Sequence, residues 1–170
     1  MTIRGNRSTY RAWNIGIFVA LCCLSIGPVH GRTGPFTGMA GAWSGEGRIE
    51  VSAEPRRRIR CSAQNDVDAQ GLEMRQRLRC MSARYHFDVA SDVVYRGGAI
   101  AGTWSEMRHN AIGEIIGTAR RGRIRAQIYG GAFTAGLTVV TLVKSQRITV
   151  TPRGFHVRRV AVTFRRSRGQ

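Results

Sequence analysis

The sequence predicts an all-β fold: an antiparallel up-and-down meander of about nine or ten strands, closing into a barrel or half-barrel after an N-terminal signal helix. Apolar and polar residues alternate with a period of two along most of the chain, which is typical of strands with one buried face. Turn signals recur at short intervals, and after the N-terminal segment no helical apolar pattern persists for three turns. A meander of this length usually closes to hide its edge strands.

Length and composition limit the alternatives. The chain has 170 residues, enough for one ordinary domain, and its 42% hydrophobic content is close to the globular average. Its 21 glycines and 4 prolines exclude collagen and Pro-rich linker proteins. The formal net charge is +17, and all but one of the 27 basic residues are arginine. This charge attracts polyanions, although a codon bias toward arginine also produces such an excess.

The N-terminal segment 1–31 has the pattern of a signal peptide. Residues 1–14 carry three arginines and no acid, residues 15–26 are uncharged and mostly apolar, and Gly27-Pro28 ends that run. Such a short run cannot span about 30 Å of hydrocarbon as a helix. We therefore expect a signal peptide over 1–31 and a periplasmic or secreted protein of net charge +14. An uncleaved anchor and a buried core helix are the alternatives.

After the signal peptide we expect a short linker over 32–40, a single β-barrel-like domain over 41–166 and a tail over 167–170. In the first strand of that domain, one face carries Trp43, Gly45, Gly47, Ile49 and Val51. The other face carries Ser44, Glu46, Arg48, Glu50 and Ser52. The two faces therefore differ in chemistry, as expected where only one of them is buried.

Four later segments repeat this alternation. Their apolar faces are Leu72, Met74, Leu78 and Cys80; Tyr85, Phe87, Val89, Val93 and Tyr95; Ile124, Ala126 and Ile128; and Ile148 and Val150. Turn signals separate the strands at 65–70, 97–98, 109–110, 121–122, 130–131, 144–145 and 153–154. Glycine in such turns supplies the positive φ that many hairpins require.

Cys61 and Cys80 are the two cysteines that remain after removal of the signal peptide. Two cysteines in an exported domain usually pair, because the compartment is oxidising. A bridge here closes a loop of about 20 residues and stabilises the fold by roughly 3 kcal/mol. A redox or metal site is the alternative, but the spacing is not Cys-x-x-Cys and further ligands at suitable positions are missing.

A Gly-x-Trp motif stands on the first strand, at Gly41 and Trp43, and a second stands at Gly102 and Trp104. In an exported meander of this size, the first motif resembles the calycin superfamily of lipocalins and avidin-like barrels. That resemblance implies a Trp that closes one end of a barrel whose open end holds a small, mostly apolar ligand. The second motif and the missing Thr-Asp-Tyr segment depart from the lipocalin pattern. The whole chain is also similar to small exported β proteins of alphaproteobacteria, which implies no activity.

The search for catalytic motifs finds none. The sequence has no Gly-x-Ser-x-Gly elbow, no active-site Cys pattern, no phosphate-binding loop and no preferred pair of carboxylates. Ser105, Glu106 and His109 stand close together, but His109 falls in a turn signal. His86 and Asp88 share one strand face, where a solvated polar face is a simpler interpretation than a metal site. We therefore predict a non-enzymatic protein without cofactor or metal.

Candidate binding residues fall into two groups. The aromatic candidates for closing the barrel and lining a cavity are Trp43, Trp104, Tyr85, Phe87 and Phe133. The arginines that are candidates for contacting a polyanion are Arg56, Arg57, Arg58, Arg121, Arg123 and Arg125. Nucleic acid is disfavoured as a partner, because base-stacking aromatics are expected on the face opposite the arginines. Anionic envelope lipids and lipopolysaccharide phosphates suit bidentate guanidinium contacts better.

Three hypotheses about function follow. The first is an exported, non-enzymatic cell-envelope barrel that binds a small apolar or amphipathic ligand. The second is a solid structural or interaction domain that docks its Arg-rich face on envelope polyanions or a partner protein. The third is a small outer-membrane β-barrel, disfavoured because glycines and acids interrupt the alternating face and the chain does not end in an aromatic residue. The sequence identifies neither the ligand nor the oligomeric state.

Overall fold

The computed structural model describes residues 33–120, 122–131, 134–154 and 156–167. The predicted signal peptide over 1–31 and all but the first residue of the predicted tail lie outside these ranges. Within them, no helix is long and apolar enough to cross a bilayer.

The described chain forms antiparallel strands and one short 3-10 helix. In chain order the elements are η1 (Thr37–Met39), β1 (Gly41–Val51), β2 (Arg57–Val67), β3 (Glu73–Met81), β4 (His86–Arg96), β5 (Ala99–Glu106), β6 (Ala111–Arg120), β7 (Arg123–Gly130), β8 (Thr134–Thr141), β9 (Ser145–Arg153) and β10 (Val157–Arg166). Each strand pairs with its neighbours in sequence, and β1 also pairs with β10. The sheet is therefore a closed barrel without an edge strand. This confirms the predicted all-β meander and its closure.

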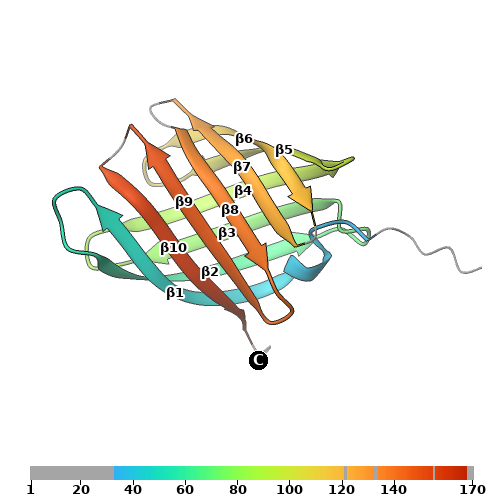
Figure 1. Cartoon of the computed structure of the whole chain (residues 1–170), viewed down its shortest axis with the longest axis horizontal. Coiled ribbons are helices and arrows are strands. Elements are labelled where there is room, and N and C mark those ends of the chain that lie inside the picture. The colour runs from blue at the N-terminus through green and yellow to red at the C-terminus, as the bar shows by residue number, and fades with distance from the viewer. Residues whose placement is uncertain (1–32, 121, 132–133, 155, 168–170) are drawn as a thin grey trace, which may run out of the picture. The chain divides into compact units, whose positions relative to one another are not determined.

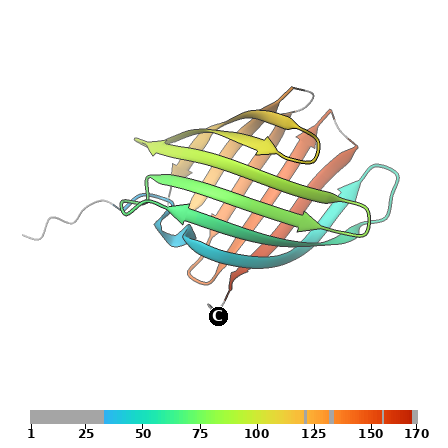
Figure 2. The ribbon, with the colours of Figure 1, turned by 180° about the vertical axis from the view of Figure 1, so that it is seen from behind.

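Figures 1 and 2 show how the barrel wall is arranged. Strands β7 to β10 form one side of the wall, and β2 to β4 run across the other side at a steep angle to them. In this antiparallel order the odd-numbered strands run one way and the even-numbered strands run the other way. We call the end where β1 begins, at Trp43, the closed end, and the end where β1 finishes, at Val51, the open end.

The inward-facing residues are those that the alternation predicts. In β1 the buried positions are Trp43, Ile49 and Val51, with two glycines between the first and the second. In β3 Met74 and Cys80 are buried, whereas the arginines between them are exposed. Strand register places such apolar positions side by side around the wall, so that most of them form one hydrophobic core.

The closed end is plugged by the segment that precedes β1. Phe36 and Met39 are 0% and 1% exposed, and both pack with Trp43 in the main core. The plug is tied to the β2–β3 turn by a main-chain hydrogen bond from Phe36 N–H to Gly71 O, at 3.2 Å. Residues 33–40, expected to be linker, thus contribute to the core of the barrel.

A shared carbonyl joins the plug to the barrel wall. The main-chain oxygen of Met39 accepts hydrogen bonds from Trp43 Nε1 at 2.9 Å and from the Asn65 side-chain amide at 2.8 Å. The Asn65 side-chain oxygen in turn accepts from Gln76 on β3, at 2.9 Å. On the other side of the indole, the Arg166 guanidinium lies over the Trp43 ring, 4.6 Å from its centroid. The polar groups that meet at this carbonyl therefore satisfy one another.

One predicted turn begins too early. The signal at 65–70 starts with Asn65, but β2 continues past this residue, and Asn65 is 2% exposed. Asn is a frequent turn residue because its side chain bonds nearby backbone; here that side chain binds the distant plug instead. The turn is organised by Asp68, whose carboxylate accepts N–H bonds from Leu72 at 2.6 Å and Glu73 at 2.8 Å.

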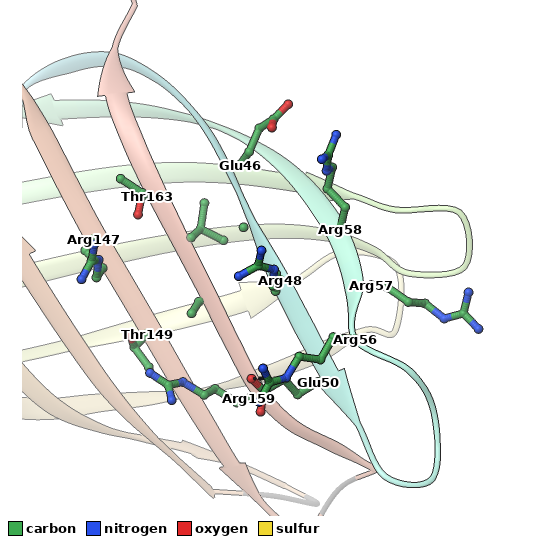
Figure 3. Close-up of a pocket in the computed structure, with 13 residues that line it drawn as sticks. Glu46, Arg48, Glu50, Arg56, Arg57, Arg58, Arg147, Thr149, Arg159 and Thr163 are labelled. Carbon is green, nitrogen blue, oxygen red and sulfur yellow. Dashed lines mark ion pairs between the residues drawn. The ribbon is translucent and has the colours of Figure 1, made fainter.

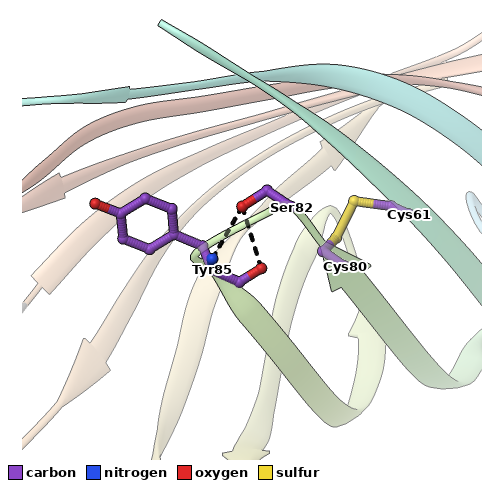
Figure 4. The surroundings of a disulfide bond; sticks show 4 residues. All are labelled: Cys61, Cys80, Ser82 and Tyr85. Carbon is purple, nitrogen blue, oxygen red and sulfur yellow. Dashed lines mark hydrogen bonds between the residues drawn. A yellow bond between two sulfur atoms is a disulfide. The ribbon is translucent and has the colours of Figure 1, made fainter. Parts of the chain in front are cut away.

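Cys61 on β2 and Cys80 on β3 form the predicted disulfide (Figure 4). The two residues lie directly opposite each other in the antiparallel register, and both are buried on the inner face. Beyond the bridge, Tyr85 N–H donates to Ser82 Oγ at 2.9 Å and so forms the turn into β4. The disulfide therefore locks the β2–β3 hairpin from inside the barrel.

At Gly113 there is no space for a side chain on β6. A Cβ atom added there would lie 1.7 Å from Tyr129 O and 2.6 Å from Trp104 Nε1. Trp104 on β5 donates that Nε1–H to the Tyr129 carbonyl on β7, at 2.9 Å. The glycine thus lets the indole reach across β6 to the next strand.

Removing the disulfide tests its contribution to stability. We expect Cys61→Ala/Cys80→Ala to lower the free energy of unfolding by about 3 kcal/mol, because the unfolded chain loses a cross-link between residues 19 positions apart. Urea denaturation of the oxidised wild type and of the double variant measures this difference. A loss below about 1 kcal/mol would mean that hairpin pairing already supplies the constraint.

Substituting Gly113 tests the close approach of β5, β6 and β7. We expect Gly113→Ala to cost at least about 1–3 kcal/mol, because the new methyl group displaces the Trp104 indole and the Tyr129 carbonyl. Gly136→Ala is the matched control, since no atom lies within 4 Å of the added Cβ, and we expect a change within about 0.5 kcal/mol. Equal costs in urea denaturation would contradict this interpretation.

Candidate functional site

The inward-facing side chains are buried at the closed end, and some of those nearer the open end are only partly buried. At the closed end, Trp43, Phe36, Phe164 and Gln146 are each at most 1% exposed. Nearer the open end, Ile49, Ile59 and Val157 are also buried, but six inward-facing apolar side chains are only partly buried. They form what we call the inner aliphatic ring: Leu78, Val89, Ile128, Leu137, Val150 and Val160. Solvent therefore reaches part of the inner face of a closed wall.

The register groups five of these residues into two runs, on β3–β4 and on β8–β10, whereas Ile128 lies opposite Ala135. Leu78 lies opposite Val89, and Val150 lies opposite both Leu137 and Val160. A barrel of eight strands is just wide enough to be filled by side chains or to hold one small ligand, and this wall has more strands. Several inward positions are also very small: Gly45, Gly47, Gly102, Gly113, Gly117, Ala126 and Ala135. At the five glycines the neighbouring backbone approaches closely, because an added Cβ would lie 1.7–2.7 Å from a main-chain oxygen of the adjacent strand.

The two predicted tryptophans have different positions. Trp43 seals the closed end, as the calycin resemblance implies. Trp104 is 7% exposed and lies near the end of β5, toward the open end. Both indoles face inward and donate to a main-chain carbonyl. The repeated Gly-x-Trp motif therefore places its tryptophans toward opposite ends of the barrel.

Two of the other predicted aromatics lie at the open end. Tyr85 and Phe87 are half-buried and pack against the small apolar cluster where β1 ends and β10 begins. The Tyr85 hydroxyl donates to Glu54 Oε1 at 3.4 Å, and Glu54 Oε2 accepts from Arg57 Nε at 3.0 Å. These contacts form a polar cluster at the rim. Phe133 lies outside the described residues.

A buried carboxylate stands at the end of β5. Glu106 faces inward and is 6% exposed. Its Oε1 accepts Asp88 N–H at 2.9 Å, and its Oε2 accepts His109 N–H at 2.7 Å and lies 2.7 Å from His109 Nδ1. Ser105, the preceding strand residue, points to the opposite face. Ser105, Glu106 and His109 therefore do not converge on one point.

Hydrogen bonds to the Glu106 carboxylate favour its ionised form. Burial raises the pKa of this carboxyl, but N–H donors from Asp88 and His109 and the His109 ring outweigh burial and hold the pKa below its ordinary value of 4.5. The carboxylate is therefore ionised at neutral pH. It adds a fixed negative charge to the open end.

Metal ligands do not gather within the described parts of the chain. There, no group of three or more His, Cys, Asp or Glu side chains comes together as a metal site requires. His86 is exposed, and the carboxylate of Asp88 is engaged by Arg79 Nε at 3.1 Å. The strand face that these residues share is therefore a polar outer face with an ion pair.

The predicted polyanion contacts separate into paired and unpaired arginines. Arg56 pairs with Glu50 at 3.2 Å, and Arg57 pairs with Glu54 at 3.0 Å. Arg58 forms no ion pair with any residue that the structure describes. Of the three, Arg58 is therefore the one whose charge is not already matched by an acid.

The remaining candidates lie farther around the wall. Arg123 and Arg125 are exposed on the outer face of β7, whereas Arg121 lies outside the described residues. Across β8, Arg123 shares a row with Val140 and then with Arg147 of β9. The basic outer face therefore continues from β7 toward β9.

Sequence reasoning missed three arginines of this outer face. Arg48, Arg147 and Arg159 come from β1, β9 and β10, and with Arg58 they border a shallow hollow of about 700 Å³ (Figure 3). Alternation alone placed Arg48 and Arg147 on a polar strand face. Their proximity results from the pairing of β1 with β10, which joins the two ends of the domain.

Comparison with known proteins identifies the fold. No family model matches the chain, and no curated protein matches it. The solved structure of Rv2717c from M. tuberculosis is similar with a TM-score of 0.64 and 10% identity, covering 78% of this chain and 94% of that chain. The S-type phycobiliprotein lyase CPES from Guillardia theta is similar with a TM-score of 0.57 and 10% identity, covering 79% and 92%.

At this identity the two structures share the fold with this chain. They support the predicted antiparallel barrel architecture. The resemblance to exported proteins of alphaproteobacteria stays a prediction.

The hydrogen bonds of Glu106 predict a pH-dependent difference between wild type and Glu106→Gln. Because the folded pKa lies below the unfolded value of about 4.5, the carboxylate stabilises the fold fully above that pH and loses this effect as pH falls through the folded pKa. We expect wild type to melt about 3–6 °C higher than the variant at pH 7. The two Tm values should converge as the pH falls well below 4.5.

Glu114→Gln provides the control for this comparison. Glu114 is exposed on the outer face of β6, so its substitution should change Tm little and equally at all pH values. A Tm gap for Glu106→Gln that persists at low pH would assign its effect to packing rather than to charge.

Proposed function

We propose that this protein is an exported, non-enzymatic barrel of the cell envelope that binds a small apolar or amphipathic ligand in its interior. The inner aliphatic ring is the observation that carries this proposal. Its six side chains face inward from a closed wall and are nevertheless only partly buried. In a solid barrel they would be as buried as the residues around Trp43. Apolar side chains around accessible interior space are the usual lining of a small-molecule site.

The residues at the open end favour an amphipathic ligand over a purely apolar one. The plug and Trp43 block the closed end, so a ligand would enter past the rim where Tyr85 and Phe87 lie. The Glu54–Arg57 pair at that rim offers polar partners. An apolar body would therefore contact the ring while a polar group stays near the rim.

Export is supported by two independent features. The N-terminal segment 1–31 has the order of regions found in a signal peptide. The Cys61–Cys80 bridge is the kind of cross-link that persists in oxidising compartments. Together they support a periplasmic or secreted location.

The fold by itself does not decide between binding and catalysis. One structure of similar fold is named as a phycobiliprotein lyase. The non-enzymatic proposal is supported by Ser105 pointing away from Glu106 and His109, since a nucleophile and its base must lie within hydrogen-bond reach.

The two competing hypotheses meet specific difficulties. A solid interaction domain does not account for the half-buried ring. An outer-membrane barrel would place the outer face in lipid, where each arginine near the bilayer midplane costs about 2–4 kcal/mol. Exposed arginines lie on outward strand faces inside the strand ends: Arg48, Arg77, Arg125 and Arg147.

Binding of an uncharged apolar dye tests the proposal. N-phenyl-1-naphthylamine brightens in apolar surroundings and carries no charge that the arginines would attract. We expect wild type to give a saturable rise in dye emission. Leu137→Trp should weaken binding roughly tenfold or more, because the indole occupies space inside the ring.

Thr138→Trp is the matched control. Thr138 is the next residue on β8 and faces outward, so its substitution should change the dye affinity by less than about twofold. Circular dichroism and urea denaturation establish that both variants fold. Absence of saturable binding by wild type, or equal losses in both variants, would contradict an interior site.

A further inference from the structure

We propose that the hollow on the outer face of β1, β2, β9 and β10 is a second binding site, one that takes a ligand carrying two or more phosphate groups. This site faces away from the interior and does not depend on the proposed interior ligand. We call it the arginine hollow and define it by its rim and floor: Arg48, Arg58, Arg147, Arg159, Thr149, Ala161 and Thr163.

The depression results from small outward residues surrounded by long ones. Its floor consists of Ala161 and Thr163 on β10 and Thr149 on β9. The register places Ala161 directly between Arg48 on β1 and Thr149 on β9. Long side chains therefore rise around a floor of short ones, and a ligand can approach the sheet closely there.

Four arginines from four strands border this floor. Arg48 and Arg58 come from β1 and β2, Arg147 comes from β9, and Arg159 comes from β10 (Figure 3). All four are exposed. None of them forms an ion pair with a residue that the structure describes.

The acids in the lining are already engaged by other arginines. Glu46 pairs with Arg60 at 3.3 Å, and Glu50 pairs with Arg56 at 3.2 Å. They contribute no ion pair to the four rim arginines. The rim thus concentrates positive charge that the described part of the protein does not neutralise.

The positions of Arg48 and Arg58 are the strongest indication that an external anion binds here. They lie directly opposite each other on the antiparallel strands β1 and β2. Like charges in such a pair repel each other and destabilise the sheet. An anion bound between the two guanidinium groups attracts both of them and so offsets their repulsion.

The chemistry of the site favours phosphate. A guanidinium group offers a planar fork of N–H donors that matches phosphate oxygens, and the hydroxyls of Thr149 and Thr163 add donors at the floor. The lining contains no aromatic side chain on which a nucleic-acid base could stack. The hollow therefore suits a phosphate compound better than a single-stranded nucleic acid.

The spacing requires more than one phosphate group. Strands lie about 4.8 Å apart, and Arg48 and Arg147 are separated by β10 and offset along it, so their backbones lie on the order of 12 Å apart. A single phosphate between Arg48 and Arg58 leaves Arg147 and Arg159 without an anion. A second phosphate group of the same ligand fills that half of the hollow.

Calorimetric titration with tripolyphosphate in about 0.15 M NaCl tests the site. We expect Arg48→Gln/Arg147→Gln to weaken binding roughly tenfold or more. The matched control is Arg77→Gln/Arg96→Gln, which removes the same charge from exposed positions on β3 and β4. Its affinity should stay within about twofold of wild type.

Thermal unfolding separates lost binding from lost folding. Without anion, Arg48→Gln should melt at or above the wild-type Tm, because it removes the repulsion with Arg58. With saturating tripolyphosphate, wild type and the control variant should gain stability, while the Arg48→Gln/Arg147→Gln variant should not. Dye binding in the interior should be the same in all of them.

Vesicles distinguish a lipid head group from a soluble phosphate compound. Flotation with phosphatidylcholine vesicles containing cardiolipin, a lipid with two phosphates, is compared with phosphatidylcholine alone. Binding of cardiolipin vesicles or of tripolyphosphate that is lost in the Arg48→Gln/Arg147→Gln variant supports the hollow and identifies the source. Equal losses in both double variants, or no binding of either probe by wild type, overturn the proposal.

Discussion

The difference between the two barrel ends depends on the hydrogen bonds of one main-chain carbonyl. The Met39 carbonyl accepts hydrogen bonds from both Trp43 and Asn65. It joins the segment before β1 to β1 and β2, and the Arg166 side chain extends the contact to the last strand by covering the indole. Four chain segments therefore meet around one Trp ring. This end is packed, and the polar groups that meet at the carbonyl are paired.

Partly buried apolar side chains lie on the inner face of the same wall that the plug completes. Burial is unequal among the inward-facing residues of this closed sheet. The residues near Trp43 form a tight core, and the inner aliphatic ring keeps solvent-accessible apolar surface that in most proteins would be buried.

The charged arginines and the apolar interior residues lie on opposite faces of each strand. Because alternate residues point to opposite faces, each strand carries arginines outward at small cost to the core. The arginines differ in whether a neighbouring acid pairs with them. Some arginines are matched by acids on neighbouring strands, as Arg79 is by Asp88. Around the arginine hollow the register brings arginine beside arginine, so positive charge is concentrated there.

The sequence by itself determined the features that depend on neighbouring residues. Period-two alternation defined the inner and outer faces and the meander, and the two cysteines outside the N-terminal segment 1–31 left one pairing for the disulfide. Tertiary structure decided the features that depend on distant residues: the use of Asn65 as a buried strand residue, the plug at 33–40 and the arginine hollow. Arg166, for example, donates to the Gly38 carbonyl, 128 positions away. No local pattern encodes such a contact, because it exists only after β1 has paired with β10.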